Sequence, residues 1–189
     1  MQTKLDTLKA ANAQRWIVAT PIRNFVSVAR ALVAAKQRYQ VVESKTGVPW
    51  HFIAVVHERE ASQNWKTQLG QGDPLDRPSI HVPVGRGPFK TWEDGAVDAL
   101  EHCAPYAARN KDWSIGGTLA KLEEYNGLGY AARDLPSPYI WSGTDQYKSG
   151  KFVRDHVYDP DAIDGQLGCA GLIMAMMALD ISIKFNEQI

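Results

Sequence analysis

The apolar segment from Trp50 to Glu60 constrains the fold more than any other part of the chain. It follows Pro49, and proline favours the beginning of a helix. Its apolar residues fall on more than one side of such a helix: Phe52, Ile53, Val55 and Val56. A helix that is apolar on several sides needs cover from other elements, so we expect it at the centre of a core. A chain of 189 residues is long enough to supply that cover within one domain.

Further helices are expected on both sides of this segment. Thr20 followed by Pro21 is typical of an N-cap with proline at the first helical position. The apolar residues that follow recur at helical spacing, and this predicts an amphipathic helix that ends near Thr46 and Gly47. Downstream, helices are expected over three ranges: Thr91 to about Cys103, Ser114 to Asn126, and about Asp159 to Ile183.

Two turn-rich stretches separate these helices. Glycine and proline are dense from Leu69 to Phe89, where the β-branched alternation from Ile80 to Val84 predicts a small hairpin within a loop. A second turn-rich stretch runs from Gly127 to Gly150. We therefore expect an α+β fold that is predominantly α, with one small β-hairpin, in a single domain over residues 1–189. Residues 1–47 would form an amphipathic helical region that packs on the core or precedes it.

Composition excludes several classes of function. The 21 Lys and Arg balance the 21 Asp and Glu, and a net charge of zero argues against a nucleic-acid partner bound mainly through phosphates. With 44% hydrophobic residues, the chain is an ordinary globular protein rather than a disordered one. Cys103 and Cys169 are too few for a disulfide scaffold, so we expect buried thiols.

The positive charge is concentrated near the N-terminus. The first forty residues contain a single acid, Asp6, against a larger set of basic residues: Lys4, Lys9, Arg15, Arg23, Arg30, Lys36 and Arg38. Such a region can make peripheral contact with an anionic surface, or it can be the solvated face of a packed helix.

Neither a membrane span nor a secretory signal is expected. The longest charge-free apolar stretch, Gly165 to Leu179, is shorter than the roughly 20 residues that a membrane-spanning helix needs. The polar start of the chain lacks the basic, apolar and small-residue regions of a secretory signal.

The carboxyl group of Glu60 is the first candidate for chemistry. In the run FIAVVHERE, Glu60 lies one helical turn from Val56 and two from Ile53, so we expect it to project from an apolar face. Glu58 lies on a different face. Burial would raise the pKa of Glu60 and let it donate a proton to a leaving sugar oxygen. The alternative is that Glu60 only ends the helix and pairs with a cation such as Arg59.

Two further motifs follow Glu60 in a definite order. The helix that closes in Arg59-Glu60 precedes the glycine-rich run Gly70-Gln71-Gly72-Asp73-Pro74, and a later helix ends in Tyr125-Asn126-Gly127. Over about Val48 to Tyr147, the chain in this order resembles the goose-type lysozyme and soluble lytic transglycosylase superfamily. In its size and its lack of a secretory signal it also resembles small phage and prophage endolysins. The resemblance implies a lysozyme-like fold and bacteriolytic activity on peptidoglycan.

The same resemblance implies roles for individual residues. Glu60 would be the catalytic acid, and Asp73 would position the attacking water. Tyr125 would lie against the acid, and Asn126 would help to hold the substrate. The run from Thr144 to Tyr147 resembles the last motif of the transglycosylases, which would place Tyr147 near the cleft.

Other substrate-binding candidates follow from the chemistry of glycan recognition. Sugar faces stack on aromatic rings, and their hydroxyl and acetamido groups need polar partners. The candidates are Gln63 and Trp65, just after Glu60, and Tyr130, Tyr139 and Trp141 in the second turn-rich stretch. The alternative for each aromatic side chain is packing in the core.

Together these features predict a muramidase, a glycosidase that hydrolyses the β-1,4 bond between N-acetylmuramic acid and N-acetylglucosamine. One alternative is a lytic transglycosylase, in which the C6 hydroxyl of the substrate attacks and yields a 1,6-anhydro sugar. Another is a non-catalytic wall-binding protein on the same scaffold.

Neither a cofactor nor a metal is expected, because a general acid and substrate distortion can supply the rate enhancement. His57-Glu58 begins like a zinc-protease helix, but the second histidine would fall at Ala61. We expect a monomer that reaches peptidoglycan strands in the periplasm or cell wall through a holin-made lesion in the membrane of its host.

Overall fold

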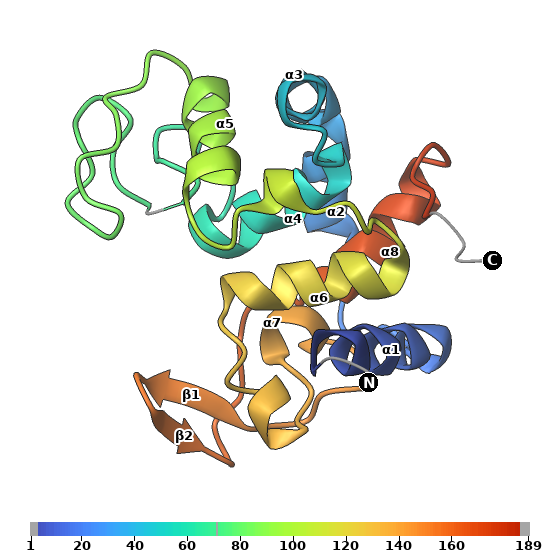
Figure 1. The fold of residues 1–189 in the computed structure, drawn as a ribbon. Coiled ribbons are helices and arrows are strands. Elements are labelled where there is room, and N and C mark those ends of the chain that lie inside the picture. Colours follow the sequence, from blue (N-terminus) through green and yellow to red (C-terminus); the bar gives the residue numbers. More distant parts are fainter. Residues whose placement is uncertain (1–3, 71, 186–189) are drawn as a thin grey trace. The chain divides into compact units, whose positions relative to one another are not determined.

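The computed structural model describes residues 4–70 and 72–185 and divides the chain into two compact units (Figure 1). The first unit contains the chain up to Ala29 and again from Trp113 onward, and the second runs from Arg30 to Asp112. The structure is mainly helical with one small antiparallel sheet, which confirms the predominantly α character expected from the sequence. Gln71, part of the glycine-rich motif, lies outside the described residues.

The second unit is built around α4 (Trp50–Ala61). All residues of α4 from Trp50 to His57 are buried, as its apolar sequence predicts. Helix α3 (Lys36–Thr46) packs against α4 and α5 (Trp92–His102). A short 3-10 helix follows at Ala107–Arg109. Helix α2 (Val26–Ala34) precedes α3 and crosses the boundary between the units.

Local capping signals fix several helix ends as the sequence predicts. Gly47 ends α3 in a left-handed conformation with φ of 71°, which glycine adopts without a steric penalty. The Thr91 side chain accepts a hydrogen bond from the backbone N–H of Asp94 and caps α5. The Ser114 side chain does the same for Gly117 at the start of α6 (Ile115–Tyr125).

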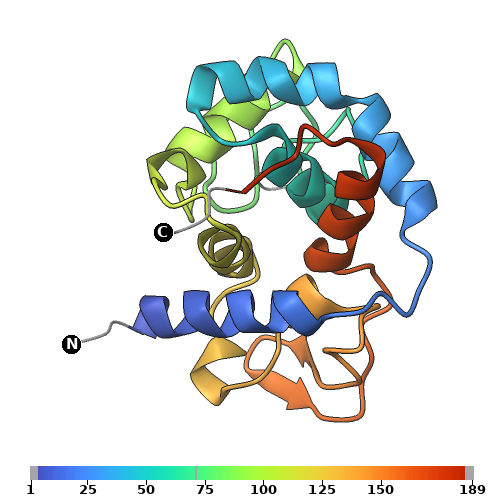
Figure 2. The ribbon, with the colours of Figure 1, turned by 90° about the vertical axis from the view of Figure 1, so that its right-hand side faces the viewer.

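The first unit contains α1 (Lys4–Val18), α6, α7 (Pro138–Trp141) and α8 (Cys169–Leu179). A 3-10 helix lies at Ala131–Arg133. Helix α1 packs on α6, and Figure 2 shows α6 nearly end-on where α1 is seen along its length, so the two helices cross steeply. Their backbones approach closely at Gly116, where a Cβ atom would lie 2.6 Å from the carbonyl oxygen of Lys9. Helix α8 packs against α7 and α6.

The small sheet does not lie where the sequence suggested. Residues Ile80 to Val84, all of them described, form bends rather than a strand, and their apolar side chains are exposed. Polar side chains of this loop bind its backbone groups, such as the N–H groups of Ile80 and His81. Backbone groups bound in this way are not available to pair with a neighbouring strand. The observed sheet instead pairs β1 (Lys151–Arg154) with β2 (Val157–Asp159).

Two helix predictions are also wrong in their bounds. The helix expected from Pro21 begins only at Val26, because Pro21 forms an isolated bridge with Thr144 and Ile22 donates to the carbonyl oxygen of Gly143. The final helix begins at Cys169 rather than near Asp159, which instead ends β2.

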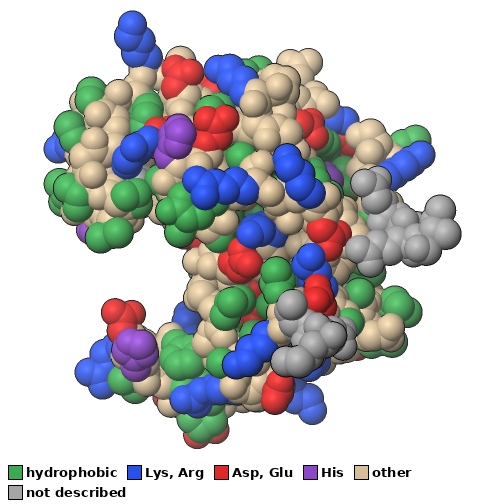
Figure 3. Space-filling model, viewed as in Figure 1, with side chains coloured by type: hydrophobic (Ala, Val, Ile, Leu, Met, Phe, Trp, Pro, Cys, Tyr) green, Lys and Arg blue, Asp and Glu red, His purple; other side chains and the backbone are tan. Residues whose placement is uncertain are grey.

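The surface carries charges of both signs. In Figure 3, basic and acidic side chains are interspersed over the face shown, and no extended patch of one sign stands out. Within residues 4–70 and 72–185, no helix is both long and apolar enough to cross a membrane. Cys103 and Cys169 are buried, one in each unit.

Candidate functional site

The end of α4 presents its two glutamates differently. Glu58 is half-buried, and its Oε2 accepts a 2.7 Å hydrogen bond from Nε2 of Gln63. Glu60 is exposed. The expectation that Glu60 would be withdrawn from water is therefore wrong in this structure, because Glu60 lies on a side of the last turn of α4 that nothing buries, although the neighbouring Arg59 is buried.

The chain reverses immediately after α4. Ser62 and Gln63 both have left-handed backbone conformations, with φ of 48° and 58°. The backbone N–H of Ser62 donates to the carbonyl oxygen of Glu58, and that of Gln63 donates to the carbonyl oxygen of His57. Left-handed conformations are costly for residues other than glycine, so these bonds are needed to hold the turn. The turn brings Gln63 back to Glu58 rather than out toward a ligand.

Trp65 belongs to an aromatic cluster of the second unit. Its ring centroid lies 4.5 Å from that of His57, 4.7 Å from that of Trp92 and 5.3 Å from that of Tyr39. The guanidinium group of Arg38 lies 3.8 Å from the ring centroid of Trp65. One face of Trp65 is therefore covered by a cation, which corresponds to the packing alternative more closely than to an open sugar-stacking platform.

His57 lies inside this cluster as a neutral side chain. Its Nδ1 is 3.0 Å from the hydroxyl oxygen of Tyr39. Burial lowers the pKa of His57 to about 4 and also raises the pKa of Tyr39 well above its ordinary value. Both groups stay uncharged near neutrality, so they serve the packing of the unit rather than acid–base chemistry.

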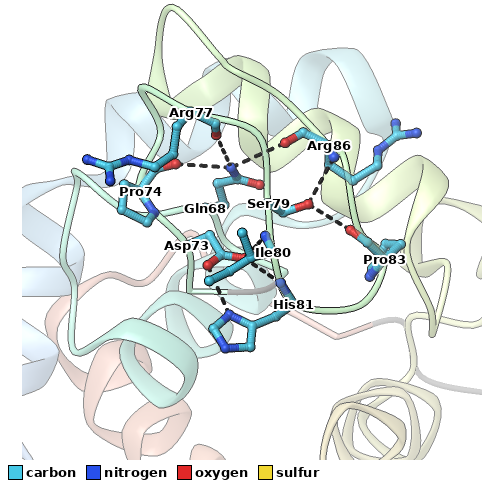
Figure 4. Close-up of polar contacts among 9 residues, drawn as sticks. All are labelled: Gln68, Asp73, Pro74, Arg77, Ser79, Ile80, His81, Pro83 and Arg86. Atoms are coloured by element: carbon cyan, nitrogen blue, oxygen red, sulfur yellow. Dashed lines mark hydrogen bonds and ion pairs between the residues drawn. The ribbon is translucent and has the colours of Figure 1, made fainter.

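Asp73 belongs to the loop that follows α4, and its side chain points into the interior of that loop (Figure 4). Its side chain is only 5% exposed. Its Oδ2 accepts hydrogen bonds from the backbone N–H groups of Ile80 and His81, each at 3.0 Å, and its Oδ1 lies 2.9 Å from Nδ1 of His81. The bond from the His81 backbone, with those from the His81 imidazole and the Ile80 backbone, lowers the pKa of Asp73. The expected role of Asp73 as holder of the attacking water is corrected, because its carboxylate is buried and engaged by the loop.

Two other polar side chains stabilise this loop from inside. Nε2 of Gln68 lies 3.0, 3.1 and 3.4 Å from the carbonyl oxygens of Pro74, Arg77 and Arg86. The Ser79 hydroxyl donates to the carbonyl oxygen of Pro83 and accepts from the backbone N–H of Arg86. In Figure 4 these contacts meet in the interior of the loop. They fix the backbone groups of a segment that has no regular secondary structure.

The remaining predicted site residues lie in the first unit. Tyr125 is the last residue of α6 and is half-buried, and Asn126 is exposed at the helix C-cap. Tyr130 is buried, and its hydroxyl oxygen accepts a hydrogen bond from the backbone N–H of Phe152. Trp141 is fully buried, and its Nε1 donates to Oδ1 of Asn12.

Tyr139 and Tyr147 are also buried. The Tyr147 hydroxyl donates to the carbonyl oxygen of Gly150 and accepts from the backbone N–H of Asp164. The expectation that Tyr130, Tyr139, Trp141 and Tyr147 stack on sugars is therefore corrected: their rings lie in the core and have no exposed face to offer.

The candidate site residues divide between the units. Glu60, Gln63, Trp65 and Asp73 lie in the second, while Tyr125 and Asn126 lie in the first. Within the second unit, the structure joins Gln63 to Glu58 and Asp73 to His81. The contact between Glu60 and Tyr125 that the resemblance implies stays a prediction.

The sequence indicated one titratable group of interest only weakly and another not at all. His81 lies between two apolar residues of the expected hairpin, where it could face a cleft or simply be exposed, and the structure shows it held by Asp73. Glu123 is buried in α6, where it follows Leu119 by one helical turn on an apolar face, and burial raises its pKa to about 7. No group of three His, Cys, Asp or Glu side chains gathers as a metal site requires in the part of the chain that the structure describes.

Comparisons of the chain with protein-family models, with curated proteins and with solved structures found no match.

Proposed function

We propose that the chain cleaves the glycan strands of peptidoglycan as a muramidase of lysozyme-like fold, with Glu60 as the acid that protonates the glycosidic oxygen. The observation that carries this proposal is the position of Glu60, exposed at the end of the buried helix α4. A glycan strand is a bulky polymer and can be cut only by a carboxyl group that it can reach. Glu60 meets this condition while its backbone is anchored in the core.

The surroundings of Glu60 support the proposal. The turn at Ser62 and Gln63 is fixed by backbone hydrogen bonds, so the end of α4 is a rigid support. The loop around Asp73 belongs to the same unit and is held by interior polar contacts.

The decisive test compares Glu60→Gln with the parent in lysis of outer-membrane-permeabilised bacteria and of purified sacculi. We expect the parent to lyse both and Glu60→Gln to lose at least about 100-fold in rate, because the amide cannot donate a proton. Glu101→Gln is the matched control, since Glu101 is another partly exposed glutamate of the second unit, on α5. Lysis by Glu60→Gln at the parental rate contradicts the proposal, and binding to sacculi without lysis by the parent would identify a wall-binding protein.

The products separate hydrolysis from transglycosylation. Mass spectrometry of the released muropeptides distinguishes them, because an anhydro product is lighter than the hydrolysed one by one water. By its resemblance to phage endolysins, we further expect a monomer without a cofactor that depends on a holin to leave the host cytoplasm.

A further inference from the structure

The loop around Asp73 holds one histidine in a defined orientation. The imidazole of His81 is 69% exposed, whereas the Asp73 side chain beneath it is 5% exposed. Asp73 accepts hydrogen bonds from Nδ1 and from the backbone N–H of the same residue, so it fixes both the ring and the main chain of His81. An exposed histidine on an ordinary loop has no such restraint.

The contact also determines which ring nitrogen carries the proton. The hydrogen bonds from His81 and Ile80 lower the pKa of Asp73, so its carboxylate is ionised and can only accept. Nδ1 of His81 must then be the donor, and in the neutral imidazole the lone pair belongs to Nε2. Because Nδ1 points at the buried Asp73, Nε2 lies on the far side of an exposed ring.

We propose that His81 is the proton acceptor of the cleavage reaction and that Asp73 is its positioning residue. This inference rests on the proposed function, in which Glu60 supplies the acid and no base has yet been assigned. Asp73 cannot meet the substrate directly, since its oxygens are engaged beneath the loop. It can act through His81, as a carboxylate that orients an imidazole and selects its tautomer.

The proton balance of the step is complete with these two groups. The attacking oxygen bonds to C1 of the muramic acid as the bond between C1 and the glycosidic oxygen breaks. Glu60 gives its proton to the leaving oxygen, and Nε2 of His81 takes the proton of the attacking oxygen. Return of one proton from the imidazolium to the carboxylate through solvent restores both groups. The attacking oxygen is water in hydrolysis and the C6 hydroxyl in transglycosylation, and either one needs this acceptor.

The interior of the loop explains how an exposed side chain can be positioned. Gln68 binds carbonyl oxygens on both sides of His81 in the sequence, at Pro74 and Arg77 before it and at Arg86 after it. Because these contacts fix the loop from within, the ring of His81 does not depend on packing of its own.

The test measures kcat and KM of the parent, His81→Gln and Asp73→Asn on purified sacculi or soluble glycan strands. We expect His81→Gln to lower kcat about 100-fold or more with KM changed less than about threefold, since general-base catalysis is worth at least that much. Asp73→Asn should lower kcat about tenfold or more. His102→Gln is the control, because His102 is an exposed histidine of the same unit beside an acid, Glu101, and should leave kcat unchanged.

Two further measurements exclude a merely structural role. Added imidazole should restore part of the activity of His81→Ala, and nitrogen-15 spectra of the parent should show the Nδ1–H tautomer at His81. A His81→Gln kcat within twofold of the parent overturns the proposal, as does an Nε2–H tautomer. If His81→Gln is active while Glu60→Gln is inactive, this inference fails alone; if the parent does not cleave glycan, the proposed function fails with it.

Discussion

The side-chain amide of Asn12 lies 3.3 Å from Oε2 of Glu123 inside the first unit. Both residues are buried, and Oδ1 of Asn12 accepts a second hydrogen bond from Nε1 of Trp141. One asparagine of α1 therefore joins a carboxyl group of α6 to an indole of α7. The buried carboxyl of Glu123 is more stable when it is protonated, because burial penalises its charge more than the Asn12 amide and the positive charge of Arg15 stabilise it.

This contact makes the stability of the first unit depend on pH. Burial raises the pKa of Glu123 from 4.5 to about 7, so the folded state binds its proton more tightly than the unfolded state does. The free energy of unfolding should therefore fall as the pH rises from about 4.5 to about 7, by on the order of 3 kcal/mol, and then become constant. Glu123→Gln keeps an acceptor for Asn12 but does not titrate, so it should remove this fall.

Denaturant unfolding of the parent and of Glu123→Gln at about pH 5 and about pH 8 measures the effect. The half-buried Glu124→Gln, next to it on α6, is the control and should leave the parental pH dependence in place. An identical pH dependence for the parent and Glu123→Gln would show that Glu123 does not titrate near neutrality.

The second unit should respond to pH with the opposite sign. Burial lowers the pKa of both His51 and His57 from 6.5 to about 4. The unfolded state therefore binds these protons more tightly, and the free energy of unfolding should fall as the pH falls from about 6.5 to about 4. Unfolding of His57→Gln should show a shallower acid dependence than the parent, whatever its absolute stability. His102→Gln, at an exposed site, should not change the slope, and equal slopes for His57→Gln and the parent would contradict this account.

Local signals in the sequence predicted much of this structure. The bounds of α4, α5 and α6 follow from apolar periodicity and from caps at Thr91 and Ser114, which act within one turn. The unpredicted features depend on partners far away in the chain. Pro21 is extended because it pairs with Thr144, a contact that no local pattern shows.

For the candidate site, too, the sequence predicted local features but not those that depend on tertiary contacts. The place of Glu60 at the end of an apolar helix could be read from spacing, but its exposure depends on which elements cover that helix. The alternation from Ile80 to Val84 indicated a strand, yet hydrogen bonds to the Asp73 side chain take the backbone N–H groups of Ile80 and His81. Side-chain capture of backbone groups is a tertiary effect, so hydrophobic alternation alone did not show it.

The loop should lose its order when the donor at Gln68 is removed. Gln68→Glu keeps the shape of the side chain but directs a carboxylate at the carbonyl oxygens of Pro74 and Arg77. We expect a loss of about 1–3 kcal/mol in the free energy of unfolding, and faster hydrogen exchange at the backbone amides of His81 and Arg86. Gln68→Met leaves the carbonyl groups unpaired without repelling them, so its exchange rates should be intermediate. Parental exchange rates in Gln68→Glu would show that this side chain does not hold the loop.

The last prediction concerns the contact of α8 with the ring of Phe25 in the first unit. A Cβ atom at Gly171 would lie 2.2 Å from Cζ of Phe25, whose ring is buried. Glycine inside a helix normally costs about 1 kcal/mol relative to alanine, so Gly171→Ala would stabilise α8 if space allowed. At Gly171 we expect the cost of overpacking to exceed this gain, with a net loss of about 1–3 kcal/mol in the free energy of unfolding.

A double-mutant cycle tests the cause of this loss. Phe25→Leu removes the ring atoms that the new methyl group meets, so it should cost less in the Gly171→Ala background than in the parent. Gly165→Ala is the control, since a Cβ atom there meets nothing within 4 Å, and it should change the free energy of unfolding by less than about 0.5 kcal/mol. If the effects of Gly171→Ala and Phe25→Leu on the free energy of unfolding simply add, the new methyl group does not press on the Phe25 ring. The clash is then relieved by movement of α8, and overpacking against the ring is not the cause of the loss.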